Sequence, residues 1–230
     1  MKNALLLLFC LICFTFCYSQ DKTLDLFSFT SINVSAGIEV ELVPGGPSAE
    51  LTMKKGDIEE LLIEQSGSDL KIKFKKQKWS MKNNNRKAYI KLYYDMDISE
   101  VEVSAGASVK GKVTMKVEDF DAEASSGGSI SMSVECEDAD IEVSSGGSVL
   151  LEGVAEDLSV EASSGGSFSG KNMEADSVDA EASSGGSATV WVTKSIVAST
   201  SSGGSIKYKG EPKKENIDAG RWSGGSIRKI

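Results

Sequence analysis

The chain has 230 residues, a formal net charge of −9 and no histidine. The acidic balance argues against nucleic acid as a partner. The lack of histidine removes the commonest general base and metal ligand of proteins. Three of the four cysteines precede residue 18, so Cys136 is alone in the rest of the chain and no disulfide can form there.

Residues 1–19 have the pattern of a signal peptide. Lys2 precedes a 12-residue apolar run, 5–16, and small residues precede a cleavage site before Gln20. This run is too short to cross a membrane. We therefore expect an exported protein, in the periplasm, on the outer surface or outside the cell, with no transmembrane segment in the mature chain. The residues before Cys17 are a poor match to a lipoprotein signal, so we do not expect lipidation.

The mature region, residues 20–230, begins with a strand–bend–strand pattern around Ala36-Gly37 and continues into an irregular insert over about 49–98. Within the insert, apolar alternation predicts strands near 49–53, 70–74 and 90–94. Asp57 is a candidate N-cap for a short helix over 57–63. We expect the insert to build extra sheet against the first coil and to cover that end of the molecule.

A pentapeptide, Ser-Ser-Gly-Gly-Ser, recurs through about residues 99–230. Full copies begin at Ser125, Ser144, Ser163, Ser183 and Ser201, and altered copies occupy 104–108 and 222–226. Their first glycines are 18 to 21 residues apart, and a fixed period of this length indicates stacked structural units. Apolar and polar residues alternate on both sides of the glycines, which predicts two short strands per repeat joined by a glycine bend.

Two strands and two turns in roughly 19–20 residues make one coil of a solenoid. Each strand then pairs in parallel with its equivalent in the next coil, about 4.8 Å away. An antiparallel sandwich or barrel also has short strands at such spacing. That alternative does not explain why the same residue type returns at the same phase seven times. The sequence therefore predicts an all-β, single-stranded parallel β-helix.

Acidic residues recur at two fixed positions before the first glycine of each repeat, four and six residues upstream. Both positions point outward from one strand, so stacking the coils would line their side chains into two adjacent columns. The members that we single out are Glu102, Glu123, Glu142, Glu161 and Glu181 in one column and Asp121, Asp140 and Asp179 in the other.

The columns have two interpretations. They form either a solvated face that resists aggregation or a surface where divalent cations, Ca²⁺ in particular, bridge neighbouring carboxylates. Residues 95–185 hold 21 acids and 4 bases, a net charge of −17, while both ends of the chain lean basic. The glycine-rich calcium nonapeptide of other β-rolls is absent. No other cofactor is expected.

Hydroxyl and aromatic residues supply further candidates. We expect the serine hydroxyls of the pentapeptides to satisfy backbone groups at the bends, with glycan contact as the alternative. Trp191, Trp222, Tyr208 and Phe168 are candidate sugar-stacking platforms. Phe168 and Tyr208 fall at the inward phase, which favours packing in the core, and Trp222 is better interpreted as part of a C-terminal cap.

The chain resembles a bacterial secreted family, the putative auto-transporter adhesin, head GIN domain. The resemblance covers about Phe29 to Ile230. It is carried by the opening Phe29-Thr-Ser-Ile-Asn-Val-Ser-Ala-Gly-Ile-Glu-Val-Glu-Leu42, the serial serine-glycine units and the ending Tyr208-Lys-Gly-Glu-Pro212. It implies a right-handed parallel β-helix at the cell surface or in the periplasm, and the family has no catalytic residues to carry over.

These observations predict a structural or adhesive binding module without catalytic activity, whose partner is a surface glycan or a protein. Two alternatives stay open. One is a periplasmic envelope protein that binds a protein partner through its ends. The other is a β-helix that binds or cleaves polysaccharide. Cleavage needs clustered acids or a cation beside a basic residue, whereas these acids are spread evenly and only Arg86, Arg221 and Arg228 are arginines.

Overall fold

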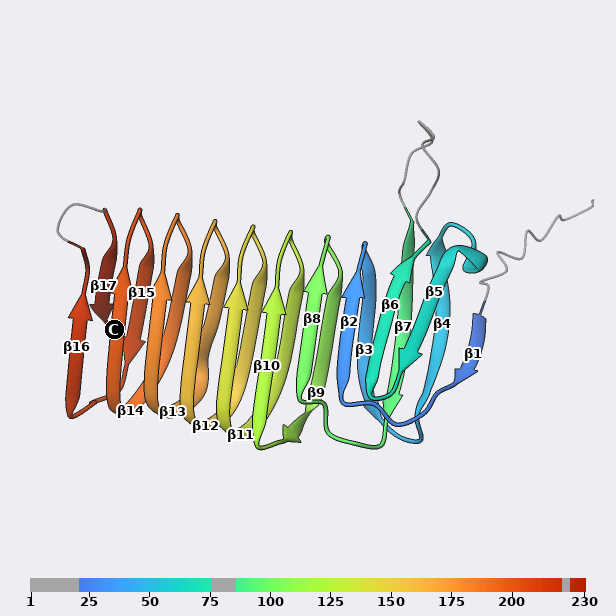
Figure 1. Cartoon of the computed structure of the whole chain (residues 1–230), viewed down its shortest axis with the longest axis horizontal. Coiled ribbons are helices and arrows are strands. Elements are labelled where there is room, and N and C mark those ends of the chain that lie inside the picture. Colours follow the sequence, from blue (N-terminus) through green and yellow to red (C-terminus); the bar gives the residue numbers. More distant parts are fainter. Residues whose placement is uncertain (1–20, 76–85, 221–223) are drawn as a thin grey trace, which may run out of the picture.

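The computed structural model describes residues 21–75, 86–220 and 224–230, and shows a straight rod of stacked coils (Figure 1). The predicted signal peptide, residues 76–85 of the insert and Trp222 lie outside the described residues. The strands are β1 Asp21–Asp25, β2 Ser31–Ser35, β3 Ile38–Pro44, β4 Ser48–Lys55, β5 Leu61–Ser66, β6 Asp69–Phe74, β7 Lys87–Tyr94, β8 Glu100–Ser104, β9 Ser108–Lys116, β10 Asp119–Ala124, β11 Ser129–Val143, β12 Ser148–Ala162, β13 Ser167–Ala182, β14 Ser187–Thr200, β15 Ser205–Lys209, β16 Lys214–Asp218 and β17 Ser226–Lys229.

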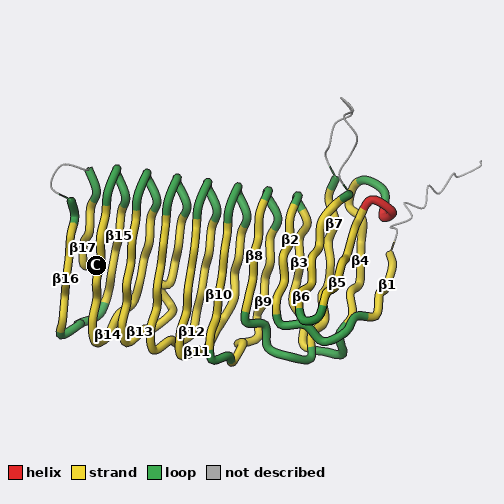
Figure 2. Tube along the Cα trace, in the orientation of Figure 1, coloured by secondary structure: helices red, strands yellow, loops and turns green. Residues whose placement is uncertain are grey.

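Each regular coil descends one side of the rod, turns at the lower edge and rises on the other side (Figure 2). The front sheet comprises β5, β6, β2, β8, β10, the second halves of β11 to β14, and β16. The back sheet comprises β1, β4, β7, β3, β9, the first halves of β11 to β14, β15 and β17. Successive coils pair in parallel, as in Ser129↔Ser148 and Glu142↔Glu161. The predicted parallel β-helix is confirmed.

The core is the narrow space between the two sheets, and the period-two alternation fills it. Val101, Ile141 and Val160, which lie five positions before the first glycine of their repeats, are at most 1% exposed. Phe168 is 2% exposed and Tyr208 7%, so both belong to the core rather than to a surface for sugars. Because every coil buries only one face of each strand, stability depends on contact with the coils on both sides.

The bends need two glycines for two different reasons. In the bend after β10, Ser126 has φ 50° and Gly127 φ 76°, and Gly128 N donates to Ser125 O at 2.8 Å. Positive φ at both central residues is the pattern of a type I′ turn. A Cβ on Gly128 would lie 2.2 Å from Val103 O in the preceding coil, whereas one on Gly127 would meet open space.

Backbone groups of stacked bends bond to one another. Ser144 N donates to Ala124 O at 2.9 Å, and Gly127 N donates to Ser145 O in the following coil at 3.2 Å. The hydroxyl contacts described at these repeats join serines instead, as between Ser187 Oγ and Ser167 Oγ at 3.3 Å. Backbone carbonyls, rather than the expected hydroxyls, therefore satisfy these N–H groups.

The N-terminal insert extends both sheets beyond the first coil. Strand β6 pairs with β2, and β7 with β3, so the coil of β2 and β3 lies between β6/β7 and β8/β9 although it comes first in the chain. Antiparallel β5, β4 and β1 add outside them. Asp57 Oδ1 accepts from Glu59 N at 3.0 Å, as expected of a cap. The helix is only the 3₁₀ turn η1, Ile58–Glu60, because Leu61 already begins β5.

Charged side chains close the C-terminal coil. Strands β16 and β17 stack on β14 and β15, and their positions continue the inward phase. Lys229 pairs with Tyr208 of the preceding coil, so it occupies the same position of the repeat. Glu215 pairs in the same way with Ile196. Lys229 Nζ pairs with Glu211 at 2.7 Å, and Tyr208 Oη donates to Glu215 at 3.3 Å. Charges at inward positions discourage another sheet from adding to an edge.

The two glycines of one bend provide a matched test of the stacking contact. Gly147→Ala would place Cβ 2.2 Å from Ala124 O, whereas Gly146→Ala meets no atom within 4 Å and only strains a φ of +73°. We expect Gly146→Ala to cost about 1–2 kcal/mol of unfolding free energy and Gly147→Ala at least about 3 kcal/mol. Urea unfolding followed by circular dichroism measures both. Equal losses would contradict the proposed role of the second glycine.

Candidate functional site

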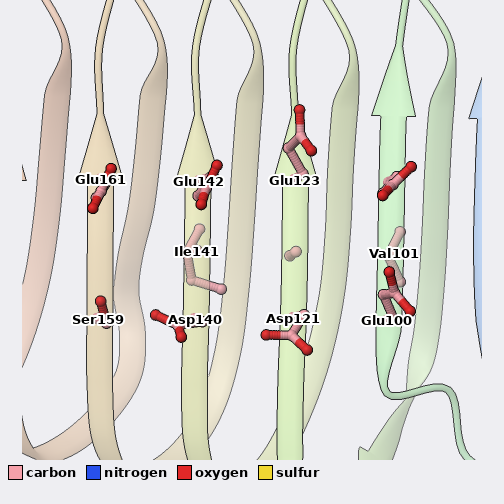
Figure 3. A pocket seen from close by; sticks show the side chains of 11 residues that line it. Glu100, Val101, Asp121, Glu123, Asp140, Ile141, Glu142, Ser159 and Glu161 are labelled. Atoms are coloured by element: carbon pink, nitrogen blue, oxygen red, sulfur yellow. The ribbon is translucent and has the colours of Figure 1, made fainter.

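The front sheet carries the acidic residues that the repeat places four and six positions before the glycine. Strand pairing places residues at the same position of neighbouring coils side by side. The glutamate column thus takes one residue from each of five successive coils: Glu102, Glu123, Glu142, Glu161 and Glu181. Asp121, Asp140 and Asp179 form the second column, which Glu100 begins and Ser159 interrupts. All eight singled-out residues thus lie on one face, which we call the acidic face; Figure 3 shows its central part, with Glu123, Glu142, Glu161, Asp121 and Asp140.

A third column of acids escaped the sequence analysis. Asp119, Asp138 and Asp157 pair in register below the aspartate column, eight residues before the first glycine of their repeats. The signal was present in the sequence, because the same glycine phase that identifies the other two columns also aligns these three. The column stops at Ser177 in the next coil. It widens the acidic face toward the lower edge of the rod.

The carboxylates line a shallow depression of about 330 Å³ on the front sheet. Figure 3 shows them standing outward from parallel strands, with Val101 and Ile141 between the two columns. Rows of a sheet repeat about every 4.8 Å. The glutamate column ends against amide and hydroxyl groups: Asn33 Nδ2 donates to Glu102 at one end, and Ser199 pairs with Glu181 at the other. The floor is rigid because every strand is hydrogen-bonded on both sides.

Partial burial and mutual repulsion make this face electrostatically unfavourable. Burial, followed by the charges of Asp140, Glu100 and Asp119, raises the pKa of Asp121 above its ordinary value. Burial, followed by Glu102 and Glu142, raises the pKa of Glu123. Among the described residues, the ion pairs within 4 Å involve acids outside the two predicted columns. The face therefore carries negative charge that lysines do not neutralise directly.

The acidic face does not form a closed metal site. In residues 21–75, 86–220 and 224–230, no group of three or more cysteine or acidic side chains converges in a geometry that could hold a metal ion. The carboxylates are instead spaced in rows. Binding of Ca²⁺ by the eight column residues stays a prediction, and it would have to use pairs of neighbouring rows.

The remaining candidates lie elsewhere. Lys209 Nζ sits 3.8 Å from the centre of the Trp191 ring, so a lysine already covers one face of that proposed sugar platform. Cys136 is half-buried, and burial, followed by the charges of Asp138 and Asp119, raises its thiol pKa to about 11. A thiol with such a pKa is protonated at neutral pH and is a poor nucleophile.

Serines form a regular column on the back sheet. Ser108, Ser129, Ser148, Ser167, Ser187, Ser205 and Ser226 pair in register through seven coils. Ser226 Oγ and Ser205 Oγ are 3.4 Å apart, like the pair described above. This column gives the back of the rod a neutral, hydroxyl-bearing strip, in contrast to the acidic front.

Known proteins share this architecture. The family described as "Putative auto-transporter adhesin, head GIN domain" matches residues 28–212. None of the curated protein sequences matches the chain. Over the part of the chain that the structure describes, no helix is long and apolar enough to span a membrane.

Solved structures share this fold. A putative adhesin from Bacteroides fragilis has a TM-score of 0.78 and 20% identity, covering 91% of this chain and 96% of that one. A putative adhesin from Parabacteroides merdae has a TM-score of 0.62 and 19% identity, covering 91% and 95%. A putative lipid binding protein from Parabacteroides distasonis has a TM-score of 0.60 and 19% identity, covering 92% and 96%. At these identities the likeness shows the fold alone.

Removing one charge from the glutamate column should stabilise the protein at neutral pH. A carboxyl whose pKa is raised by folding contributes stability that is present below its unfolded pKa and lost as pH rises through its folded pKa. Glu123→Gln should therefore raise the melting temperature by about 1–3 °C at pH 7. The gain should vanish below about pH 4, where Glu123 is protonated in both states.

Thermal melts at pH 3.5, 5 and 7 measure this difference. Asp25→Asn is the control, because Asp25 is an exposed acid on β1, outside the acidic columns. A gain from Glu123→Gln that is equal at all three pH values, or matched by Asp25→Asn, would contradict the repulsion.

Proposed function

We propose, for a chain that belongs to the auto-transporter adhesin head GIN domain family, that it is an exported, non-catalytic binding module whose acidic face holds its ligand. One observation carries this proposal: the eight predicted carboxylates stand in registered rows on one hydrogen-bonded sheet, with few basic residues nearby. An array repeated along a rod suits a ligand that is itself repetitive. A surface polysaccharide is such a ligand, and it can meet several rows at once.

Divalent cations would connect the array to such a ligand. Calcium lies 2.3–2.6 Å from its oxygen ligands, so an ion midway between carboxylates about 4.8 Å apart contacts both. Each bridge needs only two side chains, for example Glu142 and Glu161. The remaining positions of the ion, six to eight in all, would go to water or to hydroxyl groups of the glycan. Affinity for the ion alone should be weak.

Even spacing of the acids argues for binding rather than for cleavage. Glycoside hydrolysis uses one pair of carboxylates on opposite sides of the scissile bond, whereas here the acids repeat on a single flat face. The raised pKa values of Asp121 and Glu123 arise at adjacent places within the columns and do not single out one residue as an acid and another as a base. A protein partner is the alternative ligand, since its basic side chains also suit this face.

Calcium should stabilise the folded protein through the columns. With Ca²⁺ at ten times its dissociation constant, linkage gives about 1.4 kcal/mol, or a rise of about 3–5 °C in melting temperature. A chelator should reverse the rise. The double variant Glu142→Gln with Glu161→Gln should lose most of the response, because two central rows can no longer hold an ion.

The control is Glu137→Gln with Glu156→Gln, which removes the same charge from exposed positions outside the predicted columns. It should keep the response. A glycan array probed with residues 20–230 then tests ligand binding, with and without Ca²⁺. Identical melting curves in Ca²⁺ and chelator would contradict the cation bridge, and an array without hits for the unmodified protein would contradict a glycan ligand.

A further inference from the structure

A groove follows the lower edge of the rod, where the chain turns from the back sheet to the front sheet. It consists of three shallow depressions that share residues: the first two share Val117, and the second and third share Cys136 and Val154. Met96 lies at one end and Ala155 at the other. We call this feature, with its floor of Met96, Val117, Cys136, Val154 and Ala155, the lower groove.

The floor of the lower groove is apolar where the surface around it is charged. Val154 is 49% exposed and Met96 50%. Val154 pairs with Glu135 on one side and Glu174 on the other, so a valine replaces the charged residue that this outward column carries in both neighbouring coils. Val117 and Cys136 pack partly against the core beside it. One apolar side chain is thus offered at the edge in each of four successive coils.

Local backbone geometry fixes Val154 in this position. Gly153 has φ +124°, and a Cβ there would lie 2.0 Å from Val134 O in the preceding coil. The backbone of β12 therefore turns the corner close against β11, with Val154 held outward and Ala155, 7% exposed, turned inward. The apolar floor belongs to the hydrogen-bonded coil and does not depend on a loose loop.

The walls of the lower groove are acidic. Carboxylates that line it are Asp97, Glu118, Asp119, Asp121, Glu135, Glu137, Glu156, Glu174 and Asp176. Lys116, which lines the groove, pairs through Nζ with Glu135 at 2.7 Å, and the wall residue Asp176 accepts Lys194 Nζ at 2.6 Å. The excess of negative charge around an apolar strip specifies a partner that is positively charged and apolar on the same face.

We propose that the lower groove docks a basic amphipathic helix of a partner protein. A helix lying along the rod repeats its side chains every 5.4 Å turn, close to the spacing of about 4.8 Å between coils. An extended segment would present same-side residues only every 6.6 Å or so. Three steps from Met96 to Val154 span about 14 Å, the length of nine or ten helical residues. This site borders the acidic face at Asp119 and Asp121, but it does not rest on the function proposed for that face.

Two synthetic peptides of one composition test the proposal. One is a 14-residue peptide with leucines at helical spacing on one face and lysines elsewhere, and the other has the same residues scrambled so that no apolar face forms. Fluorescence anisotropy measures binding of each to the full mature chain at physiological salt. We expect the amphipathic peptide to bind at least tenfold more tightly, because charge alone serves both peptides equally.

Variants then locate the site. Val154→Lys should reduce binding of the amphipathic peptide to the level of the scrambled one, and Val154→Thr, which keeps shape and charge, should weaken it severalfold. Val197→Lys is the matched control: Val197 is also an exposed valine, 44% exposed, but it lies on the front sheet beside the aspartate column. It should leave binding unchanged. Equal binding of the two peptides, or an equal loss in Val197→Lys, would overturn the proposal and indicate attraction to the acidic face.

Discussion

The contact on which the rod depends is the approach of each bend's second glycine to the backbone of the preceding coil. At Gly128, Gly147, Gly166, Gly186 and Gly204 an added Cβ would lie 2.1–2.3 Å from a carbonyl oxygen of that coil. Only a residue without a side chain permits this distance. Because the bends fit together closely, coils cannot slide by one residue, and a slip of one residue would turn every inward side chain outward.

Fixed register has a cost on the acidic face. The same stacking that places valine on valine in the core also places carboxylate on carboxylate outside, and the neighbours raise the pKa of Asp121 and Glu123. An evenly charged sheet that is not neutralised by lysine is a poor choice for stability alone. Core packing and backbone hydrogen bonds tolerate this repulsion, so the rod can display an array that would not assemble from free side chains. The function that we propose therefore depends on the repeat as a whole and not on one pocket.

The sequence predicted what depends on the phase of the repeat. Alternation around the glycines identified the buried positions, including Phe168 and Tyr208, and both acidic columns. The alternation did not predict the features that depend on which strands pair with each other. The helix expected over 57–63 is only one 3₁₀ turn, because Leu61–Ser66 pairs with β6. Likewise, no local pattern indicates that β6 and β7 stack outside β2 and β3, since parallel partners are chosen by the whole assembly.

Pulsed electron–electron double resonance measures the distance between two spin labels. With one label on each of two bends, it tests the fixed register most directly. Ser126 and Ser202 are exposed bend residues four coils apart, and both can be replaced by cysteine for spin labelling in a Cys136→Ser background. Stacked coils place their backbones about 19 Å apart, with a narrow distribution of distances. A broad distribution centred beyond about 30 Å would show that the bends do not stack in register, and would contradict this account of the rod and of the face that it displays.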